Sequence, residues 1–422
     1  MSAISEHPQV LPPDGSGGAK VLQLLDQYPP KLPKYAYGTA GFRYDASVMD
    51  AVLVRVAVFC VWWYPQLQSQ GSGAGNNTIG IMVTASHNDE SYNGVKLVEP
   101  NGEILADAQV QGQLTEWVNS DSDKSGEKHP IRQWIEQQQS SSTSSSTPTC
   151  IIHVGHDTRS HSPALTNLAV QVIQALGGQV LHHGVATTPL LHHAVFHHNP
   201  HMVPSMIPIH NDGVGYYQLL AWSYYTLLRT STNKSKKKLV VDCACGVGYP
   251  SVQVFTKTLA SIQPTGAASM EFPSTQFCAI NGPTHGPLNE NCGSEHVQKA
   301  MAMPEWYRTP TADASSQGVV ESSWGYSAAL DGDADRIVFF SADGGKNVNF
   351  FLLDGDKITV LLCDFLQTEV ADLVQACQTL LKGSSSNKMG SLRLGAVQTA
   401  YANGASTKYL KVRLLKTLFG VA

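Results

Sequence analysis

The segment Ile79-Gly80-Ile81-Met82-Val83-Thr84-Ala85-Ser86-His87-Asn88 joins an apolar run to a polar loop. Its first five residues are apolar and lack charge, which is typical of a short buried strand. The expected strand therefore leads directly to Ser86 and His87, at the mouth of a loop that continues to Gly94. A serine beside a histidine is compatible with a nucleophile and its base, and equally with a loop that is simply polar.

Outward from this segment, short apolar runs alternate with helical patterns. The expected strands are 150–154, 179–182, 239–242, 328–330 and 337–340, and the expected helices are 162–176, 252–259 and 357–380. This alternation predicts an α/β protein built of mixed, mostly parallel sheets. Ligands of such sheets collect at the carboxyl ends of the strands, where both Ser86 and the acidic segment 331–335 are expected.

Composition limits the classes of function. The 422 residues suffice for about two to four domains, and 42% hydrophobic with 14% charged residues is a globular balance. A formal net charge of −5 gives no overall positive field, so we expect neither nucleic acid nor a membrane as partner. Eight scattered cysteines and no signal-peptide pattern predict a cytoplasmic protein with reduced thiols.

Two stretches have a distinct expected role. The apolar run 51–63 contains Arg55 and is too short to cross a bilayer, so it predicts a core helix. Residues 137–149 are a low-complexity polar stretch, which predicts a surface insertion because it has no face to bury.

Three aspartates, Asp331, Asp333 and Asp335, alternate with Gly332 and Ala334. In an extended segment, side chains at alternate positions point to one side, and three carboxylates so close repel unless a cation lies between them. Oxygen ligands favour Mg²⁺, or Mn²⁺ or Ca²⁺. The other interpretations are a solvated acidic turn and an EF-hand fragment, although an expected strand follows and no closing glutamate is present.

A magnesium site of this kind usually binds a phosphate oxygen, and Arg336 supplies a guanidinium suited to phosphate. If Ser86 carries a phosphate, it supplies that group. His87, Asn88 and Lys96 would then surround it, with Lys96 as a candidate proton carrier or, alternatively, a solvent-facing strand residue. A Ser86–His87 hydrolase is the weaker interpretation, because the G-x-S-x-G elbow is missing.

These motifs resemble those of the α-D-phosphohexomutase superfamily. Its phosphoserine loop resembles residues 84–88 followed by 93–96, and its metal loop resembles residues 331–336. Further stretches are similar to eukaryotic phosphoacetylglucosamine mutases: residues 37–43, 154–159, 353–357 and 397–404. The serine loop also precedes the Asp157-Thr158-Arg159 segment, an order that resembles this subfamily.

The resemblance implies a set of site residues and ligands. Phosphorylated Ser86 would complete a Mg²⁺ site with Asp331, Asp333 and Asp335. Lys96 would be the general acid or base and Arg43 an arginine near the reacting phosphate, with Arg336 binding phosphate and His87 a further catalytic candidate. The implied reaction interconverts N-acetylglucosamine 6-phosphate and 1-phosphate for UDP-N-acetylglucosamine synthesis, through a bisphosphate. Glucose- or N-acetylglucosamine-bisphosphate would be the phosphoryl primer, and a small sugar phosphate the partner.

Two alternatives stay open, a phosphoglucomutase or phosphomannomutase and a non-catalytic binding relative. We expect three consecutive α/β domains around a cleft: 1–200 with the serine loop, 201–300, and 301–410 with the metal loop. Residues 411–422 are expected to be a tail outside the family. The family's fourth domain, with its sugar and phosphate loops, is expected to be missing, and reduced mutase activity would follow.

Overall fold

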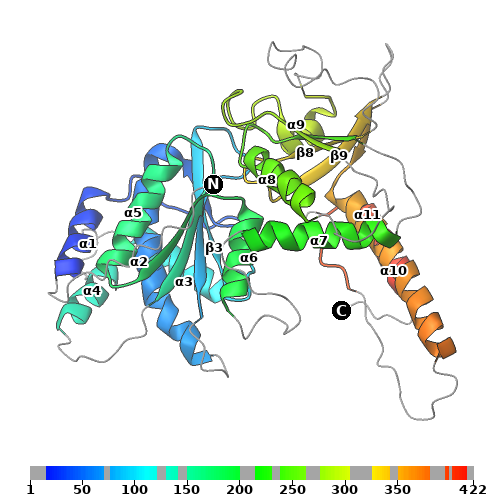
Figure 1. Cartoon of the computed structure of the whole chain (residues 1–422). Helices are drawn as coiled ribbons and strands as arrows, with labels where there is room; N and C mark the ends of the chain where they lie inside the picture. The colour runs from blue at the N-terminus through cyan, green and yellow to red at the C-terminus, as the bar shows by residue number, and fades with distance from the viewer. Residues whose placement is uncertain are drawn as a thin grey trace.

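The structure is a computed structural model. It describes residues 16–70, 77–120, 130–140, 150–199, 214–230, 238–262, 276–304, 326–342, 350–380, 395–398 and 402–415. The strands within these residues form two five-stranded sheets, each flanked by helices (Figure 1). The α/β prediction is confirmed.

The first sheet has the strand order β1-β3-β2-β4-β5. The strands are β1 Phe42–Asp45, β2 Ile79–Val83, β3 Tyr92–Val98, β4 Ile151–His156 and β5 Gln179–Val185. β2, β4 and β5 are parallel, whereas β3 is antiparallel to both β2 and β1. All five residues of β2 are buried, because helices cover the sheet on both faces.

Helices of the first half form two layers around this sheet. One layer contains α1 Ser16–Gln27, α2 Met49–Gln70, α3 Ala108–Asn119, α4 Pro130–Ser140 and α5 Ser162–Ala175. The main hydrophobic core lies between this layer and the sheet, where α2 packs against α5. α6, Thr188–His198, packs on β2 and β4 through Leu191 and Val195, which contact Met82 and Val98.

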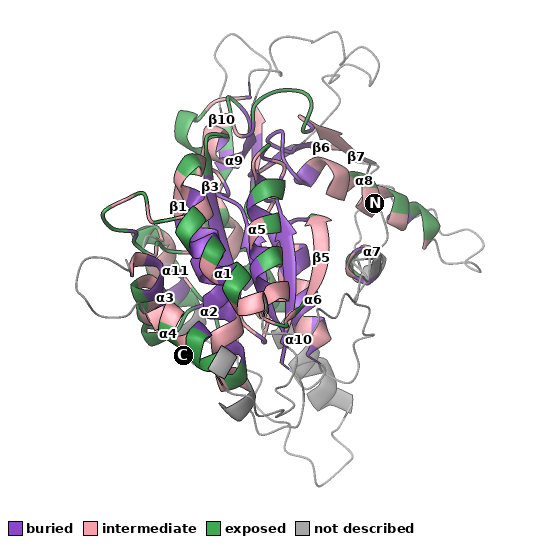
Figure 2. Cartoon of the chain, turned by 90° about the vertical axis from the view of Figure 1, so that its left-hand side faces the viewer, coloured by how far each residue is buried: buried purple, intermediate pink, exposed green. Residues whose placement is uncertain are grey.

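α2 explains the longest apolar run. Among the described residues, Ala46–Leu67 is the one helical segment long and apolar enough to span a membrane, but 72% of its hydropathy window is buried inside the protein. Figure 2 shows α2 as a largely buried helix behind α1. The prediction of a core helix at 51–63 is therefore confirmed.

The second sheet has the order β10-β9-β8-β6-β7. Its strands are β6 Lys238–Asp242, β7 Gln276–Ile280, β8 Tyr326–Leu330, β9 Ile337–Ala342 and β10 Phe350–Leu353. Its helices include α8 Gly248–Ser261 and α9 Gly293–Ala300, with α7 Val214–Thr230 against α8. α10, Gly355–Leu380, packs with α11, Gly404–Leu415, and extends away from the sheets (Figure 1).

The two sheets share one arrangement: three parallel strands, then one strand antiparallel to them, then an edge strand antiparallel to that one. β2 and β8 are the central strands, and each continues through a loop into an antiparallel neighbour, β3 or β9. The chain visits the strands in a different order in the two sheets, so the likeness is spatial and leaves no sequence repeat. The serine loop and the metal loop therefore follow equivalent strands.

The proposed domain limits at residues 200, 300 and 410 stay predictions. Strands of the ranges 201–300 and 301–410 share the second sheet. Of the expected insertion 137–149, the first four residues belong to α4, and the remainder lies outside the described residues. The tail 411–422 is described only to residue 415, within α11.

Candidate active site

The serine loop ends β2 with a strained residue. Ser86 has a φ of 55°, in the left-handed region that side chains usually avoid, and it is fully buried. Its backbone N–H donates to Thr84 Oγ1 at 2.9 Å, which stabilises the turn. The loop thereby directs the Ser86 side chain toward the second sheet.

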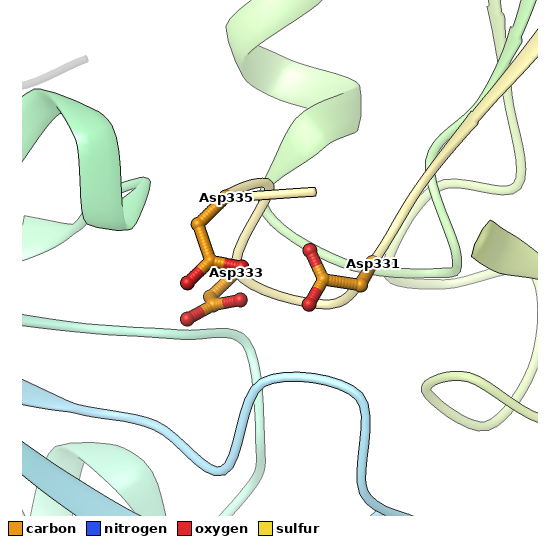
Figure 3. Close-up of side chains that lie close together, drawn as sticks. All are labelled: Asp331, Asp333 and Asp335. Carbon is orange, nitrogen blue, oxygen red and sulfur yellow. The ribbon is translucent and has the colours of Figure 1, made fainter. Parts of the chain in front are cut away.

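The metal loop follows β8 and brings its three aspartates together. One carboxylate oxygen from each of Asp331, Asp333 and Asp335 lies within 4.8 Å of the others. Figure 3 shows the carboxylates pointing into a common space. Ala334 has a φ of 58°, and its N–H donates to Asp331 O at 3.0 Å, so a tight turn makes this convergence possible.

The two loops meet directly although 245 residues separate them. Ser86 Oγ donates a hydrogen bond to Asp331 Oδ2 at 2.6 Å. Gly332 lies against the serine loop, and a Cβ at this position would be 2.8 Å from the carbonyl oxygen of Ser86. Only glycine permits this separation, so the approach of the loops depends on it.

Lys96 connects β3 to the metal loop. Its Nζ lies 2.7 Å from Asp333 Oδ2 and 2.7 Å from Asp335 Oδ2, and the residue is 2% exposed. Burial alone would lower the pKa of Lys96, but the charges of Asp333 and Asp335 raise it, so the ammonium is charged at neutral pH. The alternative of a solvent-facing Lys96 is therefore wrong.

The surroundings of Asp331 and Asp333 shift the pKa values of the two carboxyl groups in opposite directions. Burial and the charges of Asp333 and Asp335 raise the pKa of Asp331 well above its ordinary value. Burial also disfavours ionised Asp333, but the charge of Lys96 and the hydrogen bonds it receives lower its pKa. Asp333 Oδ1 is buried and has no hydrogen-bond partner among the described residues. An oxygen-lined space with excess negative charge fits a hard divalent cation.

Arg336 lies at the more exposed side of the site. Its Nη2 donates to His87 Nδ1 at 2.5 Å, and its Nη1 lies 3.4 Å from Glu295 Oε2. Because an arginine has no acceptor, His87 Nδ1 must be the acceptor. Burial and the charge of Arg336 lower the pKa of His87 to about 4, so His87 is neutral at pH 7. His87 therefore holds Arg336 in place.

Arg43 approaches the same charges from β1. Its strand partner is Gly94, at the start of the segment that leads to Lys96. Burial lowers the pKa of Arg43, whereas the charge of Asp333 raises it. All eight residues predicted for the site thus lie in or beside one cluster, with Arg43 connected to it through electrostatic interactions.

Two supporting residues were not predicted as site residues. Arg159 is 1% exposed, and its Nη2 donates to the carbonyl oxygens of Asn88 at 2.5 Å and Ser86 at 3.4 Å. Asn289 Nδ2 donates to the same two oxygens at 3.0 and 2.9 Å. These side chains fix the backbone of the serine loop from both sheets. The Asp157-Thr158-Arg159 motif was the only sequence signal for either.

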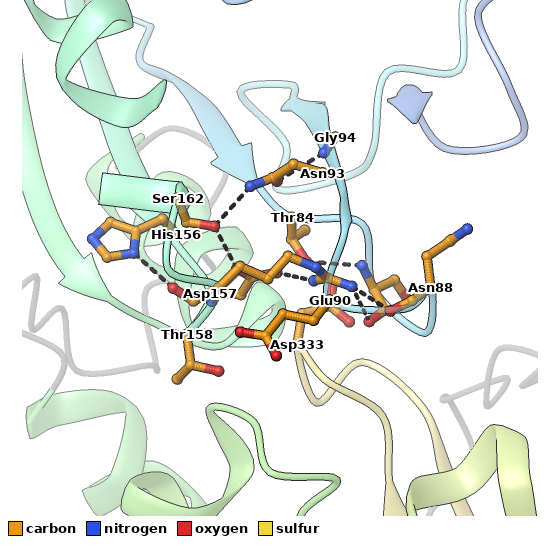
Figure 4. A network of polar contacts seen from close by, with 12 residues as sticks. Thr84, Asn88, Glu90, Asn93, Gly94, His156, Asp157, Thr158, Ser162 and Asp333 are labelled. Carbon is orange, nitrogen blue, oxygen red and sulfur yellow. Dashed lines mark hydrogen bonds and ion pairs between the residues drawn. The ribbon is translucent and has the colours of Figure 1, made fainter. Parts of the chain in front are cut away.

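Asp157 anchors Arg159 through an ion pair and accepts a hydrogen bond from Ser162 Oγ. Ser162 in turn accepts from Asn93 Nδ2 at 2.9 Å. Figure 4 shows this buried network beside Asn88 of the serine loop. The network joins β3, β4 and α5, which explains how the fold supports an unfavourable φ at Ser86.

Family models match two parts of the chain. Residues 71–124 and 133–212 match phosphoglucomutase/phosphomannomutase, alpha/beta/alpha domain I. Residues 354–419 match phosphoacetylglucosamine mutase AMG1, domain III, so this match extends into the tail 411–422.

Relatives that match most of this chain are phosphoacetylglucosamine mutases. The phosphoacetylglucosamine mutase of Mus musculus is 31% identical over 377 residues, which are 89% of this chain and 58% of the mouse protein. Phosphoacetylglucosamine mutase 1 of Schizosaccharomyces pombe is 32% identical over 394 residues, 92% of this chain and 65% of that protein. The chain thus spans 58% to 65% of the length of these two relatives.

Solved structures agree with this similarity. Aspergillus fumigatus N-acetylphosphoglucosamine mutase with GlcNAc-6P and magnesium has a TM-score of 0.70 and 29% identity, and the match covers 96% of this chain and 65% of that one. A product complex of N-acetylglucosamine-phosphate mutase, of the α-D-phosphohexomutase superfamily, has a TM-score of 0.67 and 29% identity, covering 95% and 66%. Because fold, motif order and whole-chain similarity agree, the chain belongs to the phosphoacetylglucosamine mutase family.

Proposed function

We propose that the site transfers a phosphoryl group between Ser86 and N-acetylglucosamine phosphates, as part of the interconversion of the 6-phosphate and the 1-phosphate. The observation that carries the proposal is the 2.6 Å contact between Ser86 Oγ and Asp331 Oδ2. It gives the hydroxyl that would carry the phosphate a direct contact with the acidic triad.

The residues present fit a resident Mg²⁺. Asp331, Asp333, Asp335 and the oxygen of phosphorylated Ser86 would hold it. Asp333 Oδ1, which has no hydrogen-bond partner among the described residues, offers a buried ligand atom. When bound, a hard cation neutralises charge on the transferring phosphoryl group. The A. fumigatus relatives support this choice, since one was solved with GlcNAc-6P and magnesium and another with glucose 1,6-bisphosphate.

The side chains divide the remaining work. In the transfer, the Ser86 Oγ–P bond breaks, a P–O bond forms to a sugar hydroxyl, and the hydroxyl proton ends on the Ser86 oxygen. Lys96 is our candidate for carrying that proton, although its two ion pairs favour the charged form. Arg336 and Arg43 would bind phosphoryl oxygens, and neutral His87 would orient Arg336. A sugar bisphosphate would prime the serine.

A second candidate function is a phosphoglucomutase or phosphomannomutase. The match of residues 71–124 and 133–212 to a domain of those enzymes favours it. A non-catalytic relative that only binds sugar phosphate is the alternative outside enzymes. The cytoplasmic location and the role in UDP-N-acetylglucosamine synthesis stay predictions.

The test is the half-reaction on the serine, measured with this chain. Dephosphorylated protein is incubated with Mg²⁺ and the 1,6-bisphosphates of N-acetylglucosamine, glucose and mannose in turn, and phosphate on Ser86 is measured by peptide mass spectrometry. We expect the N-acetylglucosamine compound to label Ser86 fastest. Faster labelling by glucose or mannose bisphosphate would favour the second candidate.

Two variants control this experiment. Ser86→Ala should take up no phosphate, and Asp331→Asn should lower the labelling rate while the protein stays folded. If all three bisphosphates bind and Ser86 stays unlabelled, the chain is a binding relative and the proposed transfer is refuted.

A further inference from the structure

The first turn of α6 reaches the metal loop from the opposite sheet. Thr188 is 4% exposed, and its Oγ1 donates to Asp333 Oδ2 at 2.7 Å. Its backbone N–H donates to the carbonyl oxygen of Asp333 at 3.0 Å. One residue of the first half therefore holds both the side chain and the backbone of Asp333.

This double contact fixes the orientation of the Asp333 carboxylate. Oδ2 accepts from Thr188 Oγ1 and from Lys96 Nζ, whereas Oδ1 is buried without a hydrogen-bond partner in the described part of the chain. The two oxygens of a carboxylate are equivalent, so a half rotation would restore the same arrangement, but any smaller rotation would move Oδ2 away from both donors. Two donors on one oxygen therefore fix the plane of the carboxylate and the direction of the other oxygen.

We propose that Thr188 is a positioning residue that orients Asp333 for cation binding. The inference rests on the proposed function, because it assumes that the triad binds a divalent cation. Thr188 itself binds neither cation nor substrate: it acts through Asp333.

The neighbouring residue Thr187 provides a control that distinguishes orientation of Asp333 from simple support of the helix. Thr187 is the N-cap of α6, and its Oγ1 accepts from the N–H of Leu190 at 3.1 Å. Both threonines lie at the start of the same helix. Only Thr188 contacts Asp333, so the two positions form a matched pair.

The experiment measures Mn²⁺ affinity of the full chain by electron paramagnetic resonance, since Mn²⁺ accepts the same oxygen ligands as Mg²⁺. We expect Thr188→Val to weaken binding by about 10- to 100-fold, the usual effect of losing a group that orients a metal ligand. Thr188→Ser keeps the hydroxyl and should restore the affinity. Thr187→Val should lower the melting temperature and leave the Mn²⁺ affinity unchanged.

The outcomes are distinct. Wild-type affinity in folded Thr188→Val would overturn the inference, and so would equal losses in Thr187→Val and Thr188→Val, because the effect would then come from the helix start. If Thr188→Val does not fold, Thr188→Ala takes its place with the same expectation. A wild-type chain that binds no Mn²⁺ would refute the metal site of the proposed function itself.

Discussion

Lys96 places a positive charge 2.7 Å from carboxylate oxygens of Asp333 and Asp335 in the acidic triad. It forms ion pairs with Asp333, which is fully buried, and with Asp335, which is partly exposed. A buried carboxylate is costly when it has no cation, because the loss of hydration is not compensated. The charge of Lys96 therefore stabilises the fold as well as the site.

Replacement of Lys96 by methionine should destabilise the metal-free protein by about 3–5 kcal/mol, the usual effect of removing one partner of a buried ion pair. Urea unfolding in the presence of a chelator measures it. Lys299→Met is the matched control, because Lys299 is 75% exposed and pairs with Glu295 at the surface. Unchanged stability of Lys96→Met would mean that Asp333 is protonated or solvated in the native protein.

Local sequence patterns were enough to predict Ser86 and the three aspartates as site residues. Ser86 follows a strand directly, and three alternating aspartates have few other uses, so both could be found without a structure. Asn289 and Thr188 could not, and the signal for Arg159 was only the resemblance of residues 154–159. Each acts on a carbonyl or carboxylate of a distant segment, and no local pattern encodes which segments meet.

Between elements, the serine loop and the metal loop approach each other closely at Gly332. The side chain of an alanine there would be 2.8 Å from Ser86 O and 2.9 Å from Leu288 Cδ2. Since one of these neighbours is backbone, the loop itself would have to move.

Gly332→Ala should therefore lower the free energy of unfolding by about 1–3 kcal/mol and reduce phosphate labelling of Ser86. Chemical denaturation and peptide mass spectrometry measure the two effects. Gly112 lies in the exposed part of α3 with no atom within 4 Å of an added Cβ. Gly112→Ala should be neutral or stabilising by about 0.5–1 kcal/mol, and equal behaviour of both variants would contradict the contact.

Three elements of the first half also share a chain of histidines. His153 on β4 lies 2.8 Å from His183 Nε2 on β5 and 3.0 Å from His198 Nδ1 on α6. Burial and the charges of neighbouring histidines lower the pKa of His183 to about 4, and the same causes lower the pKa of His153 well below its ordinary value. These imidazoles are neutral in the folded protein.

The unfolded chain binds protons on these histidines from about pH 6.5 downward, whereas the folded protein does not until near pH 4 for His183. Stability should therefore fall as the pH falls through this window, by about 1.4 kcal/mol per pH unit for each histidine. Urea unfolding between pH 7 and pH 5 measures the slope. His183→Gln removes one of these histidines and should reduce the slope by about 1.4 kcal/mol per pH unit. An unchanged slope would contradict a neutral buried His183.

Element types were largely predictable, because strand and helix patterns differ in period and the apolar runs are distinct. The expected strand 179–182 extends to residue 185, and the expected helix 252–259 begins at residue 248. The pairing order was not predictable. β3 and β9 are antiparallel neighbours of β2 and β8, which depends on contacts between strands and not on the pattern within one.

For the whole molecule, the site exists only because two separate sheets meet at the carboxyl ends of their parallel strands. β2 supplies Ser86 and β8 supplies the triad, from equivalent positions in two similar sheets. Arg159, Asn289 and Thr188 add hydrogen bonds across the same junction. The resemblance to a known family predicted that these two loops form one site. The similar strand arrangement of the two sheets could not be predicted, because no sequence repeat accompanies it.

The central claim is that one divalent cation binds between Ser86 and the triad, and crystals grown with Mn²⁺ test it through anomalous diffraction. The account predicts a single strong peak at about 2.0–2.3 Å from oxygens of all three aspartates and of Ser86 or its phosphate. A peak that excludes Ser86, or one at the Arg336 side of the loop, would contradict it.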